Sequence, residues 1–384
     1  MAHWQRLFLR NQASKTRHQI GMIFERATLK NCGILLLLLT SVVLTGCIRV
    51  KQSSDTPRLL KAEDSTRAEM LAEINRFARV GSLRAKMYLK FEDNSFAEFG
   101  NKEVYRSADG EIVVQRPAKI YMKVQVPVIH SDVAQMTSDG TSFRVAILKD
   151  DGSGKLKKFI KGTNSADYSP LQKRFDSMDI EGGKDVKASV NAMANLRPQH
   201  FTDAMLVAPT DPKHTYVLST VYQPEEDATQ QKKSPLRNVV RPYYLLDEVM
   251  TNSAGVPQIS RRFWFDRVGG LRLSRLQLFD KNAEIESDIV YGLQGNLTNT
   301  GDYNNLPLEI IVTRPKEHYS MRLKYQAPED VTIGKTYPDK AFMLENSWGL
   351  EELDLDKKLA DLAVQQTTPS PRSTPAPTSA VHLN

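Results

Sequence analysis

Cysteine is scarce in this sequence, which has only Cys32 and Cys47 among its 384 residues. A disulfide framework or a four-ligand zinc site cannot be built from so few thiols. The seven histidines add no metal pattern, because none stands at a ligand-type spacing from another histidine or a cysteine. We therefore expect no metal and no cofactor, and a fold stabilised by the burial of apolar side chains.

The N-terminal apolar run is too short to span a membrane. It covers residues 32–44, which is 13 residues, whereas a spanning helix needs about 20. Arg26 and Lys30 precede the run, and Leu44-Thr45-Gly46-Cys47 closes it. This arrangement is typical of a secretory signal peptide that ends in the lipobox of a bacterial lipoprotein. The alternative is a short buried helix with an incidental cysteine.

Cleavage at this site defines the mature N-terminus. We predict that residues 1–46 are removed and that Cys47 becomes the lipid-modified first residue, with a second acyl chain that makes the anchor stable. Ile48 follows, where an aspartate would resemble an inner-membrane retention signal in enteric bacteria. We therefore expect an outer-membrane anchor facing the periplasm, with the inner membrane as the alternative. A start at Met22 instead of Met1 would leave a signal of conventional length.

A strong excess of charge is missing from the mature chain. The full sequence has a formal net charge of +7, but residues 1–46 hold six Lys or Arg and one Glu and account for +5 of it. The remaining charge is near +2, which is too little for a dedicated nucleic-acid-binding protein. We expect no nucleic-acid partner.

Motifs for catalysis are also missing. Gly152-Ser153-Gly154-Lys155 lacks the first glycine of a phosphate-binding loop, and Leu156 stands where Ser or Thr would bind magnesium. Asp150-Asp151-Gly152 lacks the alternating oxygen ligands of a calcium loop. The sequence has no Gly-x-Ser-x-Gly motif for a nucleophile. We expect a non-enzymatic protein with no catalytic residues.

What the sequence does contain is a helix followed by alternating strands. Met70, Ile74 and Phe77 recur at helical spacing, and Ser65 precedes them as the expected N-cap. Strict alternation of apolar and polar residues is clearest over residues 120–126. Ser107-Ala108-Asp109-Gly110 is expected to form a turn. Further strands are expected over residues 83–91, 98–107, 112–115, 133–138, 142–148, 155–161, 216–222, 242–250, 258–266, 271–279, 285–292, 306–313 and 319–325.

The order of these elements predicts the fold class. A second helical segment over residues 185–206 separates two antiparallel meanders, and residues 350–364 predict an acidic helix. Residues 223–240 predict a long surface loop. Hairpin turns at short spacings exclude a doubly wound sheet. We predict a mainly β (α+β) fold, in which a curved antiparallel sheet forms an incomplete β-barrel with helices plugging the concave side.

The expected organisation has five parts. A polar segment with Pro57 after the signal peptide predicts a tether, and a C-terminal stretch rich in Thr, Ser, Pro and Ala predicts disorder. The parts are the signal peptide (1–46), the tether (47–64), one half-barrel domain (65–325), a C-terminal extension with a helix (326–364) and a disordered tail (365–384).

Five stretches carry a resemblance to a known family. They are "GSLRAKMYLKF" (81–91), "IVVQRPAKIYMKVQVPV" (112–128), "SDGTSFRV" (138–145), "LRPQHFTDAML" (196–206) and "RFWFDRVGGLRLSRLQLFDKNAEIESDIVYG" (262–292). In these stretches the chain resembles the periplasmic lipoprotein-sorting superfamily, the LolA/LolB-like carrier and receptor proteins. The resemblance implies an incomplete β-barrel, closed on one side by helices, whose apolar interior holds acyl chains. Residues 300–384 have no clear counterpart, and the chain is longer than a typical carrier.

The resemblance implies that apolar strand residues contact the lipid. Ordinary core packing is the alternative for each of them, because apolar faces of strands are normally buried. Arg116, which precedes Pro117, is similar to the family pattern as well, although it would equally suit an ion pair with a surface carboxylate. The candidate lipid-binding residues are Met87, Leu89, Phe91, Ile120, Met122, Val124, Phe143, Val145, Ile147, Phe263 and Phe265.

Two functions remain open from the sequence. The first is an outer-membrane-anchored lipoprotein that binds lipid or lipoprotein acyl chains, in lipoprotein sorting or envelope lipid handling. The second is a non-enzymatic assembly lipoprotein of the same fold, which binds a protein partner of the envelope through residues 223–240 and the C-terminal segment. A secreted hydrolase is disfavoured by the missing nucleophile and metal motifs.

Overall fold

The computed structural model describes residues 56–93, 103–104, 107–127, 130–149, 157–168, 170–171 and 197–367. The chain divides into two compact units, residues 1–56 and 57–384, and the fold below is that of the second. No helix within the described ranges is both long and apolar enough to cross a membrane. Cys47 lies outside these ranges, so its lipidation stays a prediction.

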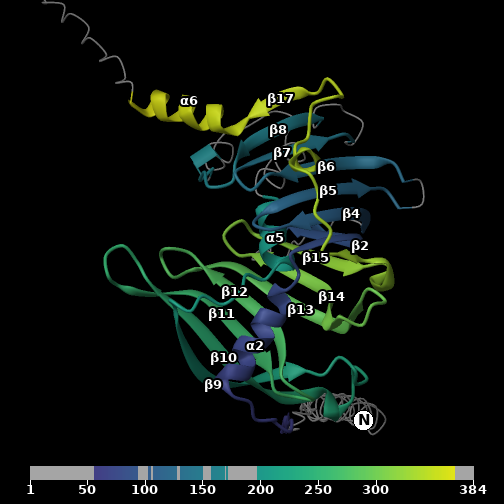
Figure 1. The fold of residues 1–384 in the computed structure, drawn as a ribbon, viewed down its shortest axis with the longest axis vertical. Helices are drawn as coiled ribbons and strands as arrows, with labels where there is room; N and C mark the ends of the chain where they lie inside the picture. The colour runs from purple at the N-terminus through teal and green to yellow at the C-terminus, as the bar shows by residue number, and fades with distance from the viewer. Residues whose placement is uncertain are drawn as a thin grey trace, which may run out of the picture. The chain divides into compact units, whose positions relative to one another are not determined.

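The described strands form one large sheet that is mostly antiparallel and not closed (Figure 1). The mainly β class predicted from the sequence is confirmed. The 17 strands are β1 (Arg58–Leu59), β2 (Ser82–Asp93), β3 (Glu103–Val104), β4 (Ala108–Gln115), β5 (Lys119–Gln125), β6 (Asp132–Ser138), β7 (Ser142–Ile147), β8 (Lys158–Thr163), β9 (Thr215–Glu226), β10 (Asn238–Thr251), β11 (Pro257–Asp266), β12 (Arg272–Phe279), β13 (Ile285–Leu297), β14 (Tyr303–Arg314), β15 (Tyr319–Tyr325), β16 (Thr332–Ile333) and β17 (Glu351–Asp354).

Two antiparallel meanders make up this sheet. In the first, β2 pairs with β4 and the strands then follow in chain order to β8. In the second, β9 to β15 pair in the same sequential way. Pairing of β15 with β2, from Tyr319 opposite Asp93 to Tyr325 opposite Met87, joins the meanders. One sheet therefore spans both halves of the described chain.

Alternation along the strands produces the buried face. In β5, Ile120 and Met122 are fully buried, whereas the intervening Tyr121 and Lys123 are half-exposed. A strand directs successive side chains to opposite faces, so this pattern places every second residue in the core. The half-buried strand predicted over residues 120–126 is confirmed, as are the strands of the second meander.

Helix α2 (Arg67–Ala78) follows the predicted helical pattern and buries Met70, Ile74 and Phe77. Its N-cap is Thr66 and not Ser65, because the Thr66 side chain accepts a hydrogen bond from the Glu69 backbone, while the Glu69 carboxylate accepts one from the Thr66 backbone. This reciprocal capping box satisfies two backbone donors of the first turn. The helix packs on β12 of the second meander.

Two further helices lie in the described chain. Helix α5 (Gln199–Met205) packs on β4, β5 and β14 and so contacts strands from both meanders. It confirms the end of the segment predicted as helical over residues 185–206, whose first part lies outside the described residues. Helix α6 (Leu355–Thr367) confirms most of the acidic C-terminal helix.

Three local predictions were wrong. Residues 351–354, expected in a helix, form β17, because they pair in parallel with β8. Ser107 to Gly110, expected as a turn, lies mostly within β4. The loop predicted over residues 223–240 shrinks to 227–237, because β9 and β10 form a long hairpin that pairs Glu226 with Asn238. The polar composition of residues 223–240 predicted a loop, but polar residues also occur in strands whose side chains are exposed.

Both flanks of the expected central domain join the same sheet. In the segment predicted as a tether, β1 pairs in parallel with β10, and Arg267 binds the Glu63 carbonyl oxygen and the Asp64 carboxylate. In the C-terminal extension, β16 pairs with β2 and β17 with β8. The described parts of both segments are therefore integral to the fold.

Candidate functional site

The candidate lipid-binding residues lie together in one apolar cluster. Nine of the eleven are buried, while Phe91 and Val124 are partly buried and pack against the cluster. They come from β2, β5, β7 and β11, so strands of both meanders contribute to the same interior. Their closeness supports a shared role, but ordinary core packing is consistent with the same burial. Their contact with lipid stays a prediction.

Both short helices complete this interior. Met70, Ile74 and Phe77 of α2 belong to the cluster, and so do Phe201, Ala204 and Met205 of α5. The apolar face of the sheet is thus covered by α2, of 12 residues, and α5, of seven residues. We call these two helices the helical cover. Such short helices depend on packing for their stability, because isolated helices of this length are marginal in water.

Arg116 fastens both helices to the sheet. It stands at the end of β4, and its guanidinium donates to the carbonyl oxygens of Ala78, Leu206 and Val207, at 3.1, 3.2 and 2.7 Å. Ala78 is the last residue of α2, and Leu206 and Val207 directly follow α5. These acceptors replace the surface carboxylate that the sequence left open as a partner. Burial lowers the pKa of Arg116 below its ordinary value.

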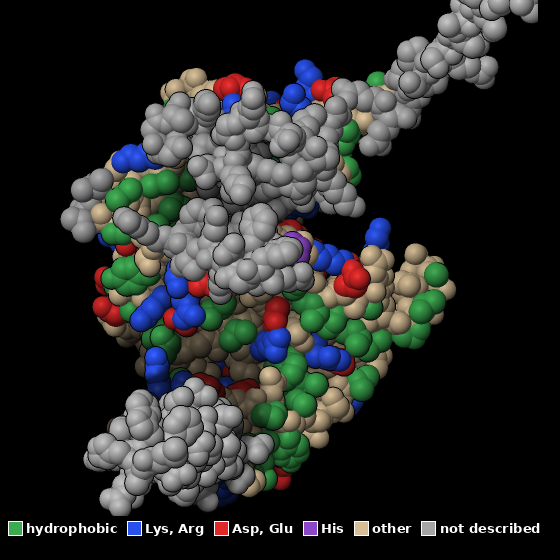
Figure 2. Space-filling model, turned by 180° about the vertical axis from the view of Figure 1, so that it is seen from behind, with side chains coloured by type: hydrophobic (Ala, Val, Ile, Leu, Met, Phe, Trp, Pro, Cys, Tyr) green, Lys and Arg blue, Asp and Glu red, His purple; other side chains and the backbone are tan. Residues whose placement is uncertain are grey.

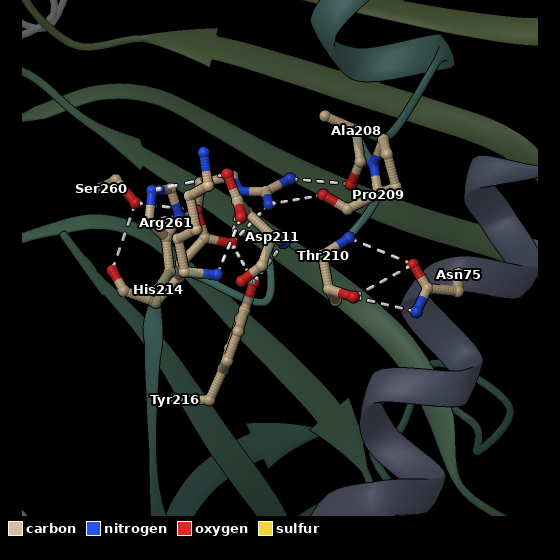
Figure 3. A network of polar contacts seen from close by, with 11 residues as sticks. Asn75, Ala208, Pro209, Thr210, Asp211, His214, Tyr216, Ser260 and Arg261 are labelled. Atoms are coloured by element: carbon tan, nitrogen blue, oxygen red, sulfur yellow. Dashed lines mark hydrogen bonds and ion pairs between the residues drawn. The ribbon is translucent and has the colours of Figure 1, made fainter.

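A buried ion pair holds the segment that leads from α5 to β9. Glu248 of β10 is 2% exposed and accepts hydrogen bonds from Arg261 of β11, the Tyr216 hydroxyl and the Ser260 hydroxyl. His214 contacts the same carboxylate at 3.0 Å. Figure 3 shows Tyr216 of β9, Ser260 and Arg261 of β11, and His214 of the linker (the segment between α5 and β9) close together. Burial favours the neutral acid, but Arg261, Tyr216 and His214 outweigh it and lower the pKa of Glu248.

The same network reaches α2. Arg261 donates to the carbonyl oxygens of Ala208 and Pro209, at 2.8 and 2.9 Å. Next to them, the Thr210 hydroxyl and backbone bond with the Asn75 side chain, at 2.9 and 3.1 Å (Figure 3). Asn75 lies on the exposed side of α2. Polar contacts thus connect the linker after α5 both to the sheet and to α2.

A second fastening joins α2 to β14. Arg76 donates to the carbonyl oxygens of Asn304 and Asn305, at 2.6 and 3.1 Å, and pairs with Glu73 on its own helix. The helical cover therefore packs on the sheet through apolar side chains, and hydrogen bonds join its edges to the sheet. Hydrogen bonds of this kind contribute about 1 kcal/mol each, so together they are strong enough to hold the cover and weak enough to exchange for other interactions.

Sequence reasoning missed this polar network. Spacing in the sequence gives His200 and His214 no partner, and the structure pairs them with Tyr319 and Glu248. Glu248 and Arg261 are brought together by pairing between β10 and β11. A hairpin register would have shown this pair, but spacing in the sequence does not. Within the described residues, no three His, Cys, Asp or Glu side chains are grouped to hold a metal.

Comparison with known proteins adds solved structures only. No family profile and no curated protein matches the sequence. A LolA superfamily protein from Nitrosomonas europaea matches 73% of this chain and 99% of its own, at 11% identity and a TM-score of 0.36. The chain resembles LolA superfamily structures. A DUF1329 family protein from Desulfovibrio piger (73% and 96%, 13% identity, TM-score 0.35) and an outer-membrane lipoprotein-sorting domain from Vibrio parahaemolyticus (71% and 94%, 11% identity, TM-score 0.33) match similarly.

Proposed function

We propose that this LolA-like chain is a periplasm-facing outer-membrane lipoprotein that binds acyl chains of lipids or lipoproteins between its sheet and its two helices. The supporting observation is the cover itself: α2 and α5 share one apolar interior with the sheet and are fastened at their margins by polar contacts. Breaking those contacts uncovers an apolar groove without unravelling the sheet. Binding of this kind needs no catalytic residue and no cofactor.

The energies make such an exchange feasible. Burial of one methylene contributes about 0.8 kcal/mol, so a chain of about 14 methylenes gains roughly 11 kcal/mol on leaving water. The five hydrogen bonds that Arg116 and Arg76 make at the margins oppose opening, at about 1 kcal/mol each. The apolar surface that the helices expose is covered again by the ligand. A single acyl chain therefore suffices to replace the helical cover.

The proposal is tested by a covalent cross-link that prevents α2 from moving away from the sheet. Mature protein without Cys47, residues 48–384, has no cysteine, so the pair Arg76→Cys and Asn304→Cys provides the only thiols. These positions join α2 to β14 across one hydrogen bond. A short bismaleimide cross-link between them should abolish uptake of a fluorescent fatty acid and of lipid detected by native mass spectrometry.

Single-cysteine controls distinguish the effect of the cross-link from the effects of the substitutions and of the reagent. Each single-cysteine variant, treated with the same reagent, should bind lipid like the parent protein. If the cross-linked protein still binds lipid, or if neither form extracts lipid from vesicles, the groove between sheet and helices is not the binding site. The anchor is tested separately, because Cys47→Ser should abolish incorporation of labelled palmitate.

A protein-binding scaffold remains the second candidate. Strand β9 exposes Val217, Leu218 and Tyr222, which are 50%, 38% and 54% exposed, next to the loop over residues 227–237. Apolar side chains on an exposed strand are suited to a protein partner. Replacing the three by Thr should abolish capture of an envelope partner under this hypothesis, and should leave lipid uptake unchanged under the first.

A further inference from the structure

A polar cavity of about 510 Å³ lies beside α5, apart from the polar fastenings of the cover. The turn between β6 and β7, the end of β8, the start of α5 and the start of β13 line it. On the face drawn in Figure 2, basic and acidic side chains intermingle with apolar ones. None of the eleven candidate lipid-binding residues lines this cavity, so it is a separate site.

Two acceptors in the cavity lack partners. Asp203 of α5 makes no hydrogen bond or ion pair with any described residue. Asn164, at the end of β8, is only 6% exposed, and its Oδ1 has no hydrogen-bond partner in the described protein. Its Nδ2 donates to the Ser138 hydroxyl at 2.8 Å. A buried acceptor without a donor is costly unless a ligand supplies one.

A third acceptor is only weakly neutralised. Glu286 of β13 lies 3.4 Å from Arg314, but the same guanidinium binds Glu317 and the Ser287 hydroxyl, each at 2.7 Å. Burial, and after it the charge of Glu286, raise the pKa of Asp203 to about 6. Arg314 therefore neutralises Glu286 only in part, because it forms shorter contacts with Glu317 and Ser287.

Arg197 is the one lysine or arginine among the described residues that line the cavity. Arg197 donates one hydrogen bond to the Asn164 carbonyl oxygen at 2.7 Å, and its guanidinium lies over the Tyr168 ring. An arginine has five N–H groups, so several remain for a ligand. His200 is held neutral, because burial lowers its pKa and its Nδ1 bonds to the Tyr319 hydroxyl. Acceptors and a donor thus face one space.

We propose that this cavity binds a zwitterion with a primary ammonium group and a phosphate, of the ethanolamine phosphate type. The ammonium has three N–H donors, which match Asp203, Glu286 and Asn164 Oδ1. The phosphate accepts from Arg197, whose planar guanidinium suits phosphate oxygens. A quaternary ammonium has no N–H to donate, so the cavity discriminates against choline. Because α5 packs on the apolar interior, a lipid bound as in the proposed function would place its head group here.

The experiment compares head groups at constant acyl chain. Binding of dihexanoyl phosphatidylethanolamine and dihexanoyl phosphatidylcholine to residues 48–384 is measured by isothermal titration calorimetry, together with free O-phosphoethanolamine and phosphocholine. We expect each ethanolamine compound to bind at least 10-fold more tightly than its choline counterpart. Asp203→Asn should remove this preference, and Asp330→Asn, an exposed carboxylate elsewhere, should retain it.

The outcomes separate this inference from the proposed function. Equal affinity for both lipids overturns the head-group site and leaves acyl binding intact. Preference for O-phosphoethanolamine, with no binding of either lipid, supports the site with a free zwitterion as ligand and contradicts the proposed function. An unchanged preference in Asp203→Asn overturns the assignment, because that variant removes the charge on which the ammonium depends.

Discussion

Neutralising Asp203 should stabilise the protein in a pH-dependent way. The carboxylate has no partner among the described residues, and its pKa lies near 6 instead of the ordinary 3.8. The difference, about two pH units, corresponds to a cost of about 3 kcal/mol for the ionised form in the folded state. Asp203 is partly exposed to its cavity, so we expect Asp203→Asn to recover about 1–3 kcal/mol at pH 7.5.

The direction with pH follows from proton uptake. Because the folded-state pKa is the higher one, the folded protein retains a proton that the unfolded chain has lost between pH 4 and 6. The free energy of unfolding therefore falls as pH rises through this range in the parent protein. Asparagine does not titrate, so the advantage of the variant should be full above pH 6 and nearly absent below pH 4.

Urea unfolding of residues 48–384 at pH 4.0 and pH 7.5, followed by circular dichroism, measures this difference. Asp302→Asn is the matched control, because Asp302 is exposed, and it should change the free energy of unfolding by less than about 0.5 kcal/mol. The reasoning is refuted if Asp203→Asn destabilises the protein at pH 7.5, or if its gain is equal at both pH values.

Three further changes probe the cover and the core. Arg116→Ala should cost about 1–3 kcal/mol and speed hydrogen exchange in α2 and residues 206–215, because three backbone acceptors lose a charged donor. Glu248→Gln should cost about 3–5 kcal/mol, since it leaves the partly buried Arg261 without its counter-charge. Acid should weaken the parent as pH falls through the lowered pKa of Glu248 and affect the variant less. Met122→Ala should cost about 2–5 kcal/mol in urea unfolding if Met122 packs as core.

Control substitutions test the Arg116 and Glu248 predictions, and a small effect would contradict the Met122 prediction. Arg79→Ala, on an exposed residue of the α2 C-terminus, should leave exchange in the cover unchanged. Asp247→Asn removes a more exposed ion pair from the same two strands, with Arg262, and should cost about 1 kcal/mol or less. A cost below about 1 kcal/mol for Met122→Ala would mean that its surroundings are not tightly packed, and would favour a lipid cavity at that point.

Local patterns accounted for much of the fold. Alternation over residues 120–126 predicted β5 because a strand with one buried face repeats every two residues. The stripe of Met70, Ile74 and Phe77 predicted α2 because a helix with one buried face repeats every three to four. One error arose where composition alone was the guide, because the polar side chains of residues 223–240 are compatible with a loop and with an exposed strand.

The sequence by itself determined which residues are apolar, their period and therefore the mainly β class, together with the predicted lipobox at Cys47. Only the tertiary structure decided that Arg116 reaches the ends of two helices, and that Glu248 meets His214 and Arg261. It alone placed Asp203 and Glu286 in the lining of one cavity. The physical reason is that period and composition are local properties of the chain, whereas these contacts depend on strand register and helix packing between distant segments.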